Sequence, residues 1–409
     1  MPVQFRHATL DNGLEIIAEA DPNAHTAGVG FFVKTGARDE DAGVMGVSHF
    51  LEHMMFKGTE RRTAEEVDRA FDDIGAEHNA YTTSEQTAFW AHCLPEHLPA
   101  AEEVLADLLR PALREEDFDA EKPVILEEIA MYRDHPFWGL YETSMEANYG
   151  AHPHSHRVLG TEQTVGEMTR PQMAAYFNDR YAADNTVVAL AGSVDFDDMV
   201  RRLTDHCGAW QRTGTQRQHP QASPAAEQFT LDSETVNRHY LLMIAPAPAM
   251  RDDRRYAAGM LAQILGDTEG SRLYWALIET GLAEEALSQY EGRDGLGEYL
   301  VYASCSPEDA DSVEQVVTGE IDRLIDSITA DDLERVRSKA ATAVTLHGEL
   351  PAGRMRRLGR MWTYMGEYRS LEEELSRIDA VTLDELGAVH AEFPMRPVVV
   401  GRLTPKPSA

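Results

Sequence analysis

Two histidines and a glutamate fall within five residues of one apolar stretch, as His49, Glu52 and His53. The hydrophobic residues that surround them predict a buried helix. Residues four apart lie on the same face of a helix, one turn from each other, so both imidazoles would point the same way. Glu52 would lie on a neighbouring edge of that face, within reach of a group bound between the two imidazoles.

The order H-x-x-E-H is one of the arrangements found in zinc sites that activate water. Two neutral imidazoles can bind one zinc ion, while the carboxylate of Glu52 stays free to accept a proton. The alternative is an ordinary helix that happens to carry these residue types. We favour the metal site, because buried polar side chains cost free energy when they have no partner.

A zinc site that keeps one position for water usually takes three protein ligands. A later segment offers carboxylates at Glu121, Glu127 and Glu128. Glu121 and Glu128 are two helical turns apart and would share one face of a helix over 115–133. Pro123 makes the position of Glu121 less secure, because proline breaks or starts helices. Periodicity alone does not choose Glu128 over Glu127, for which a solvated surface position is the alternative.

The alternation of short apolar runs and helical patterns predicts an α+β fold, with helices packed on mainly antiparallel sheets. An Asn12-Gly13 turn separates two short strands. Thr63 and Glu66 have the spacing of a capping box at the start of a helix. Predicted strands of the first half cover 7–17, 27–34, 79–82, 86–91 and 185–192, and further predicted helices cover 63–74 and 96–109.

The second half of the chain repeats the pattern of the first, after a linker at 214–228 that is rich in small and polar residues. Three residues recur at an offset of 212 positions: Cys93, Pro95 and Glu96 match Cys305, Pro307 and Glu308. We therefore predict two homologous halves, a zinc-bearing catalytic half at 1–213 and a structural repeat at 229–409.

The metal motif is present in only one of the two copies of the repeat. At the same offset, three apolar residues replace the motif: His49, Glu52 and His53 match Leu261, Ile264 and Leu265. Only the first half is therefore expected to bind a metal.

Further segments give the chain a specific likeness to a known family. The motif is followed by Asn79-Ala80-Tyr81-Thr82 and then by Val124-Ile125-Leu126-Glu127-Glu128. The 74 residues from 54 to 127 separate His53 from Glu128. This order and spacing resembles the family of pitrilysin, insulysin and the mitochondrial processing peptidase. The likeness covers essentially the whole chain and is closest to members with one pair of halves per chain.

The resemblance implies a zinc metalloendopeptidase that cuts peptides or unfolded segments within a closed chamber. It assigns one Zn²⁺ per chain to His49, His53 and Glu128. It makes Glu52 the catalytic base and matches Glu121 to a second glutamate near the catalytic site.

The resemblance also assigns the substrate-binding stretch. Asn79 matches the residue that holds the substrate backbone, and Ala80 and Tyr81 continue the same stretch. We expect the peptide substrate to add as a strand beside these residues, through main-chain hydrogen bonds.

One part of the family pattern is missing from the second half. Active members carry an arginine and, seven residues later, a tyrosine that help bind the substrate carbonyl. Here one residue is missing before Gly281, and with that gap Ile278 falls on the arginine and Glu284 on the tyrosine. We therefore expect a same-fold partner chain, in a heterodimer, to supply the missing pair. The alternative is a homodimer in which Arg272 or Tyr290 substitutes.

Composition excludes several other classes of function. The net charge of −33 argues against nucleic-acid binding, which needs a basic surface. No stretch is apolar enough for a membrane helix, and no signal segment is evident, so we expect a cytoplasmic protein. Three widely spaced cysteines do not predict a disulfide framework. The alternative to an enzyme is a non-enzymatic assembly or core subunit of a larger complex.

A second group of histidines alternates at His152, His154 and His156. On a strand they would face one way and could bind a metal. We instead expect an exposed loop at this position.

Overall fold

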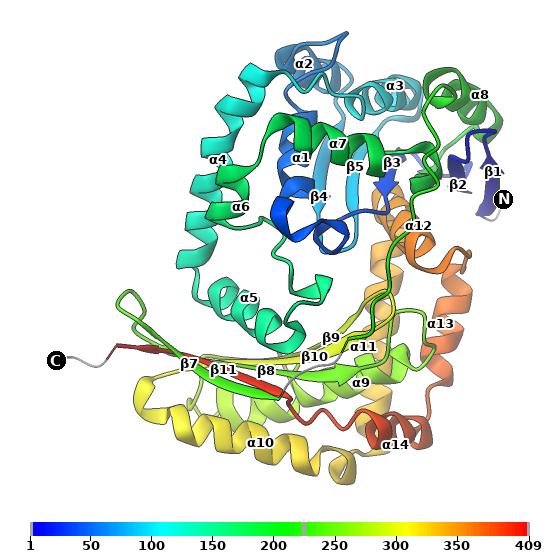
Figure 1. Ribbon diagram of the computed structural model, residues 1–409. Helices are drawn as coiled ribbons and strands as arrows, with labels where there is room; N and C mark the ends of the chain where they lie inside the picture. The colour runs from blue at the N-terminus through cyan, green and yellow to red at the C-terminus, as the bar shows by residue number, and fades with distance from the viewer. Residues whose placement is uncertain (1–2, 223–225, 407–409) are drawn as a thin grey trace. The chain divides into compact units, whose positions relative to one another are not determined.

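The computed structural model describes residues 3–222 and 226–406. The chain divides into two compact units, each built on one β-sheet with helices packed against it (Figure 1). Unit 1 contains 1–129, 156–218 and 346–369, and unit 2 contains 130–155, 219–345 and 370–409.

Unit 1 is organised around a six-stranded sheet with the order β1-β2-β6-β3-β5-β4. Its neighbouring strands are antiparallel, except for the parallel pair β2 and β6. Strands β3 and β6 are buried along their whole length, which explains their continuous apolar sequences. The strands are β1 (Gln4–Thr9), β2 (Glu15–Ala20), β3 (Ala27–Val33), β4 (Glu77–Thr82), β5 (Thr87–Cys93) and β6 (Thr186–Gly192).

Helices cover both faces of this sheet. Phe32 of β3 packs with Met355 and Leu358 of α12 on one face, whereas the adjacent Phe31 contacts Trp210 on the other, as alternation along a strand requires. The helices are α1 (Val47–Met55), α2 (Ala64–Asp72), α3 (Leu98–Leu108), α4 (Glu115–Asp134), α6 (Glu162–Glu167), α7 (Arg170–Arg180), α8 (Phe196–Cys207) and α12 (Pro351–Met365).

Two local predictions for unit 1 meet different outcomes. The capping box is confirmed, since Thr63 Oγ1 accepts a hydrogen bond from the backbone N–H of Glu66 and the Glu66 carboxylate accepts one from the N–H of Thr63. The concern about Pro123 was wrong, because α4 continues through it. Pro123 is exposed, so the backbone carbonyl that loses its helical partner there can be solvated.

Unit 2 contains a five-stranded sheet with the order β7-β11-β8-β10-β9. The strands are β7 (Glu227–Ser233), β8 (His239–Ala247), β9 (Glu285–Gly292), β10 (Gly297–Cys305) and β11 (Val399–Pro405). The helices are α5 (Pro136–Tyr149), α9 (Arg255–Leu265), α10 (Ala310–Ser327), α11 (Ala330–Glu349), α13 (Leu371–Ala380) and α14 (Leu383–Glu392), with a π-helical turn at Tyr274–Ile278.

The two sheets share one topology. The order β2-β6-β3-β5-β4 in unit 1 corresponds to β7-β11-β8-β10-β9 in unit 2, and the single parallel pair lies at the same place in each. Cys93 and Cys305, which match in the sequence repeat, end the equivalent strands β5 and β10. The prediction of an α+β fold with two homologous halves is confirmed.

Each unit contains one helix from the other half of the sequence. Helix α5 packs on β8 and β11 of unit 2, and α12 packs on β3 and β6 of unit 1. The proposed linker has no helix or strand from 214 to 222, and β7 begins at Glu227. The part of the linker at 223–225 lies outside the described residues.

Close approach of α12 to the sheet depends on a glycine. A Cβ at Gly359 would lie 2.2 Å from the ring of Phe32, which is fully buried. We therefore expect Gly359→Ala to lower the free energy of unfolding by about 1–3 kcal/mol, the usual cost of overpacking a core. Chemical denaturation of the purified protein measures this change.

The matched control is Gly319→Ala in α10, where an added Cβ meets no atom within 4 Å. That variant should be stabilised by about 0.5–1 kcal/mol, because alanine favours a helix over glycine. Equal effects of the two substitutions would contradict the tight contact at Gly359.

Candidate metal centre

Helix α1 carries the two motif histidines, and its start is fixed by the backbone. Gly46, the residue before the helix, has a φ of +94°, and a Cβ there would lie 2.5 Å from the carbonyl oxygen of Leu159. Only glycine fits this position without strain. The helix then buries His49, Phe50 and most of its other residues, as the apolar sequence predicts.

A buried carboxylate also holds the start of α1. Glu40 accepts hydrogen bonds from the backbone N–H groups of Gly46 at 2.6 Å and Ser48 at 2.8 Å. These groups have no partner within the helix, so Glu40 satisfies them as a side-chain cap does. Burial raises the pKa of Glu40 to about 8, although the hydrogen bonds from Ser48 and Gly46 oppose the shift. The Ser48 hydroxyl in turn lies 2.8 Å from the hydroxyl of Tyr176 in α7.

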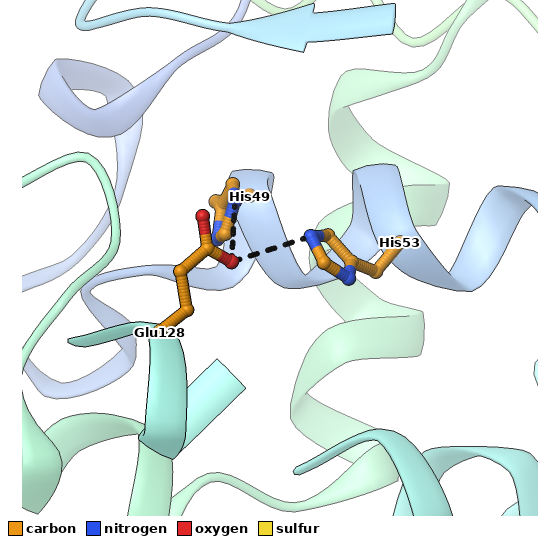
Figure 2. A group of neighbouring side chains, drawn as sticks. All are labelled: His49, His53 and Glu128. Atoms are coloured by element: carbon orange, nitrogen blue, oxygen red, sulfur yellow. Dashed lines mark ion pairs between the residues drawn. The ribbon is translucent and has the colours of Figure 1, made fainter. Parts of the chain in front are cut away.

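The imidazoles of His49 and His53 converge on Glu128 of α4 (Figure 2). The Nε2 atoms of both histidines lie 3.6 Å from the same Glu128 oxygen, Oε2. One ligand atom from each residue lies within 4.8 Å of the other two. In the described part of the chain, this is the only group of three histidine, cysteine or acidic residues arranged in this way. Its neighbour Glu127 is exposed.

Glu121 contacts His53 and Lys57. Its Oε1 atom lies 2.8 Å from Nδ1 of His53, and its Oε2 atom lies 2.5 Å from Nζ of Lys57. Burial alone would raise the pKa of Glu121, but the hydrogen bonds from Lys57 and His53 outweigh it and lower this pKa. Glu121 therefore orients His53 and fixes the proton on Nδ1, leaving Nε2 as a lone-pair donor.

The charge state of His49 and the spacing of the three side chains suit a zinc ion. Burial, together with the charge of His53, lowers the pKa of His49 to about 4, so this imidazole is neutral near pH 7. Tetrahedral zinc with ligands at roughly 2.0–2.1 Å places ligand atoms about 3.3 Å apart, close to the observed 3.6 Å between each Nε2 and Glu128 Oε2. Two nitrogens and one carboxylate oxygen are also a ligand set that catalytic zinc uses. The residues thus fit a zinc ion.

Glu52 is held from the sheet. Its Oε2 atom accepts a hydrogen bond of 2.6 Å from the hydroxyl of Thr82, at the end of β4. Burial raises the pKa of Glu52, and the hydrogen bond from Thr82 opposes this shift. The carboxylate is therefore fixed beside the histidines while one of its oxygens stays available for a proton.

Strand β4 is the edge of the unit 1 sheet, because only β5 pairs with it. Tyr81 packs with the cluster that includes Met355 of α12, whereas Thr82 contacts Glu52 on the opposite face. By alternation, Asn79 lies on the Tyr81 face and Ala80 on the face of the histidines. The Asn79 side chain accepts a hydrogen bond from the N–H of Ala80 at 2.8 Å.

The other candidate residues of unit 2 make contacts within that unit. Glu284 pairs with Arg238 at 2.5 Å, and Ile278 packs against the core. The two possible substitutes are also engaged. The guanidinium of Arg272 lies 2.7 Å from Asp332, and the hydroxyl of Tyr290 donates to the carbonyl of Pro248 at 2.8 Å.

The alternating histidines do not form an exposed loop, so that prediction was wrong. His152 and His154 are buried in and beside a short 3-10 turn at Pro153–Ser155, and their rings stack with centroids 5.3 Å apart. The ring of Tyr149 contacts both of them, so they are part of the packing of α5.

Three supporting residues around the motif were not found from the sequence. Glu40 accepts hydrogen bonds at the start of α1, Lys57 pairs with Glu121, and Thr82 donates a hydrogen bond to Glu52. Thr82 belongs to the quoted Asn-Ala-Tyr-Thr stretch, but nothing in its spacing shows a contact with Glu52. The structure alone reveals these contacts.

No helix in the described part of the chain combines the length and the apolarity that crossing a bilayer requires.

Comparison with known proteins places these features in a family. The family model described as insulinase (peptidase family M16) matches residues 15–162, and the model described as peptidase M16 inactive domain matches residues 167–340. An uncharacterized zinc protease of Mycobacterium bovis is 34% identical over 391 residues, covering 94% of this chain and 89% of that protein. One from Bacillus subtilis is 29% identical and covers 94% of each chain.

Solved structures share the fold. A protease from Helicobacter pylori matches with a TM-score of 0.93 at 20% identity, over 99% of this chain and 100% of that chain. A chain from complex III2 of Candida albicans matches with a TM-score of 0.84 at 16% identity, over 98% and 95% of the two chains. Given family models on both halves and a relative similar along nearly its whole length, this chain belongs to the insulinase family of peptidases, M16.

Proposed function

We propose that this chain is a zinc metalloendopeptidase that hydrolyses peptide bonds in peptides or unfolded segments within a closed chamber. The observation that carries the proposal is the convergence of His49 and His53 on one oxygen of Glu128, with Glu52 on the same helix. The relatives named as zinc proteases support the same chemistry. The cytoplasmic location stays a prediction.

The proposed mechanism divides the work between a metal and the residues of unit 1. A bound zinc ion would polarise the scissile carbonyl and lower the pKa of water. Glu52 takes the proton from water as general base and passes it to the leaving amine as general acid. The raised pKa of Glu52 suits this exchange, since a carboxyl group that must also donate a proton works best with a pKa closer to neutral. Thr82 keeps the carboxylate in place.

The substrate binds beside β4. An edge strand presents unpaired N–H and C=O groups, and an extended peptide can pair with them. The stretch Asn79, Ala80 and Tyr81 provides these main-chain groups, and Ala80 lies on the face of the histidines. Main-chain pairing would let one site accept peptides of many sequences.

The zinc site makes its own prediction. The purified chain should hold about one zinc ion, measured by elemental analysis, and His53→Ala or Glu128→Ala should remove it. Glu121→Gln should lower zinc affinity by about 10- to 100-fold, the usual effect of losing a residue that orients a ligand.

The matched control is Glu127→Ala, which removes the exposed carboxylate beside Glu128 and should retain the metal. Loss of zinc from Glu127→Ala but not from Glu128→Ala would show that Glu127, and not Glu128, is the zinc ligand. A wild-type chain that stays metal-free in added zinc would contradict the metalloenzyme.

Glu52 can be tested separately from the metal. Glu52→Gln keeps the size and polarity of the side chain but removes the base, so zinc content should stay the same. Hydrolysis of unfolded peptides should fall at least about 100-fold, the lower end for general acid–base catalysis.

The control for the change from glutamate to glutamine is Glu65→Gln, on the exposed surface of α2. It should leave hydrolysis within about twofold of the wild type. Near-normal turnover of the Glu52 variant would show that another group is the base.

We further propose that this chain is the zinc-bearing member of a heterodimer of same-fold chains. Ile278 cannot donate a hydrogen bond to a developing oxyanion, and an ionised Glu284 would repel it. Arg272 and Tyr290 already have partners in unit 2, which argues against their use as substitutes in a homodimer. Loss of one oxyanion donor costs about 100- to 1,000-fold in rate.

The partner is tested by assaying the purified chain alone on a mixture of unfolded peptides, and then with fractions of extract from its own cells. We expect weak activity that one fraction raises by about 100-fold or more. As a control, the Glu52→Gln variant is assayed with the same fractions, which measures the hydrolysis caused by peptidases of the extract. Full activity of the chain alone, with no gain from any fraction, would exclude an obligatory partner.

A further inference from the structure

Two arginines of α12 project beside the sheet of unit 1. Arg356 and Arg360 are four residues apart and therefore lie on one side of the helix, one turn from each other. Both are exposed. The guanidinium of Arg356 lies over the ring of Trp90 in β5, 5.0 Å from the ring centroid.

The sheet register places this pair beside the edge strand. Trp90 is directly opposite Asn79 of β4, so both side chains lie on the sheet face that α12 covers. The hydroxyl of Tyr81 donates to Gln86, whose amide donates to the Thr363 hydroxyl on the next turn of α12. The arginines thus lie on the Asn79 and Tyr81 face of β4.

Both charges also act on the hydroxyl of Tyr81. Burial raises the pKa of the Tyr81 hydroxyl, while the positive charges of Arg360 and Arg356 oppose this shift. The two guanidinium groups therefore act on the same side of the edge strand.

These charges have no internal counter-charge. The neighbouring Arg354 pairs with Asp21 at 3.2 Å, and Arg357 pairs with Glu19 at 2.5 Å. Within residues 3–222 and 226–406, neither Arg356 nor Arg360 pairs with a carboxylate. The whole chain carries a net charge of −33. Two like charges one turn apart repel each other, and a bound anion would relieve the repulsion.

We propose that Arg356 and Arg360 form a subsite for acidic side chains of the substrate. A peptide that adds to β4 places every second side chain on the face of Asn79 and Tyr81, and the others on the face of the histidines. Aspartate or glutamate on the first face can accept charge-assisted hydrogen bonds from the guanidinium groups. The subsite rests on the proposed binding of a peptide strand and adds a preference for acidic residues at alternate positions.

The test measures binding separately from hydrolysis, in the zinc-loaded Glu52→Gln chain. Three fluorescent unfolded peptides of one sequence carry Glu, Gln or Lys at the same alternate positions, and fluorescence anisotropy gives their Kd values. We expect the Glu peptide to bind about tenfold or more tightly than the Gln peptide, and the Lys peptide to bind most weakly. Adding Arg356→Gln and Arg360→Gln should reduce the Glu preference to within about twofold.

Arg201→Gln, at an exposed position in α8 of the same unit, gives a control with the same change of charge per residue and should keep the full preference. Higher salt should weaken the preference in the wild-type arginine background. A Glu preference that is absent, or that persists without both arginines, would overturn the subsite. Failure to bind any of the three peptides would overturn it as well.

The same peptides separate this inference from the proposed activity. If the zinc-loaded wild-type chain, with its partner fraction, cuts none of them while the arginine-dependent preference persists, peptide hydrolysis is contradicted and the subsite is supported. If all three are cut at equal kcat/KM and bound equally, hydrolysis is supported and the subsite is overturned.

Discussion

The close approach of two imidazoles to one carboxylate is the constraint on which the candidate metal centre depends. His49, His53 and Glu128 come from two different helices, and partial burial removes water that would otherwise solvate them. Such a cluster costs free energy without a partner. Burial keeps His49 neutral, which is the form of imidazole that can bind a metal, so the same desolvation that opposes folding suits this side chain to a metal ion.

The positions of α1 and α4 are supported by residues outside the cluster of His49, His53 and Glu128. Glu40 caps the start of α1, Glu121 joins α4 to His53 and Lys57, and Thr82 ties Glu52 to the edge of the sheet. The three contacts come from a loop, a helix and a strand. A shift of α1 would therefore disturb several hydrogen bonds at once, which favours a single geometry for the site.

Local chemistry predicted much of this arrangement. The capping box at Thr63 follows from a short-range pattern, and the match of Cys93 with Cys305 follows from a fixed offset of 212 positions. The structure confirms both. The contacts of Glu40 and Thr82 did not follow, because they join residues that are distant in sequence and have no shared period. Packing of α12 on the sheet of the other half was missed for the same reason. The need for glycine at position 359 of α12 becomes evident only when the structure places the ring of Phe32 against it.

The two halves show how one fold separates stability from chemistry. In unit 2 the positions of the motif hold Leu261, Ile264 and Leu265, and all three have no exposed surface. Burying each such side chain contributes about 1.5–3 kcal/mol, whereas the polar residues at the same positions in unit 1 carry a desolvation cost. A repeat without the polar cluster can thus fill its core with apolar side chains. By the same argument, the unit that keeps the polar cluster is under selection for more than folding, because apolar residues would stabilise it better.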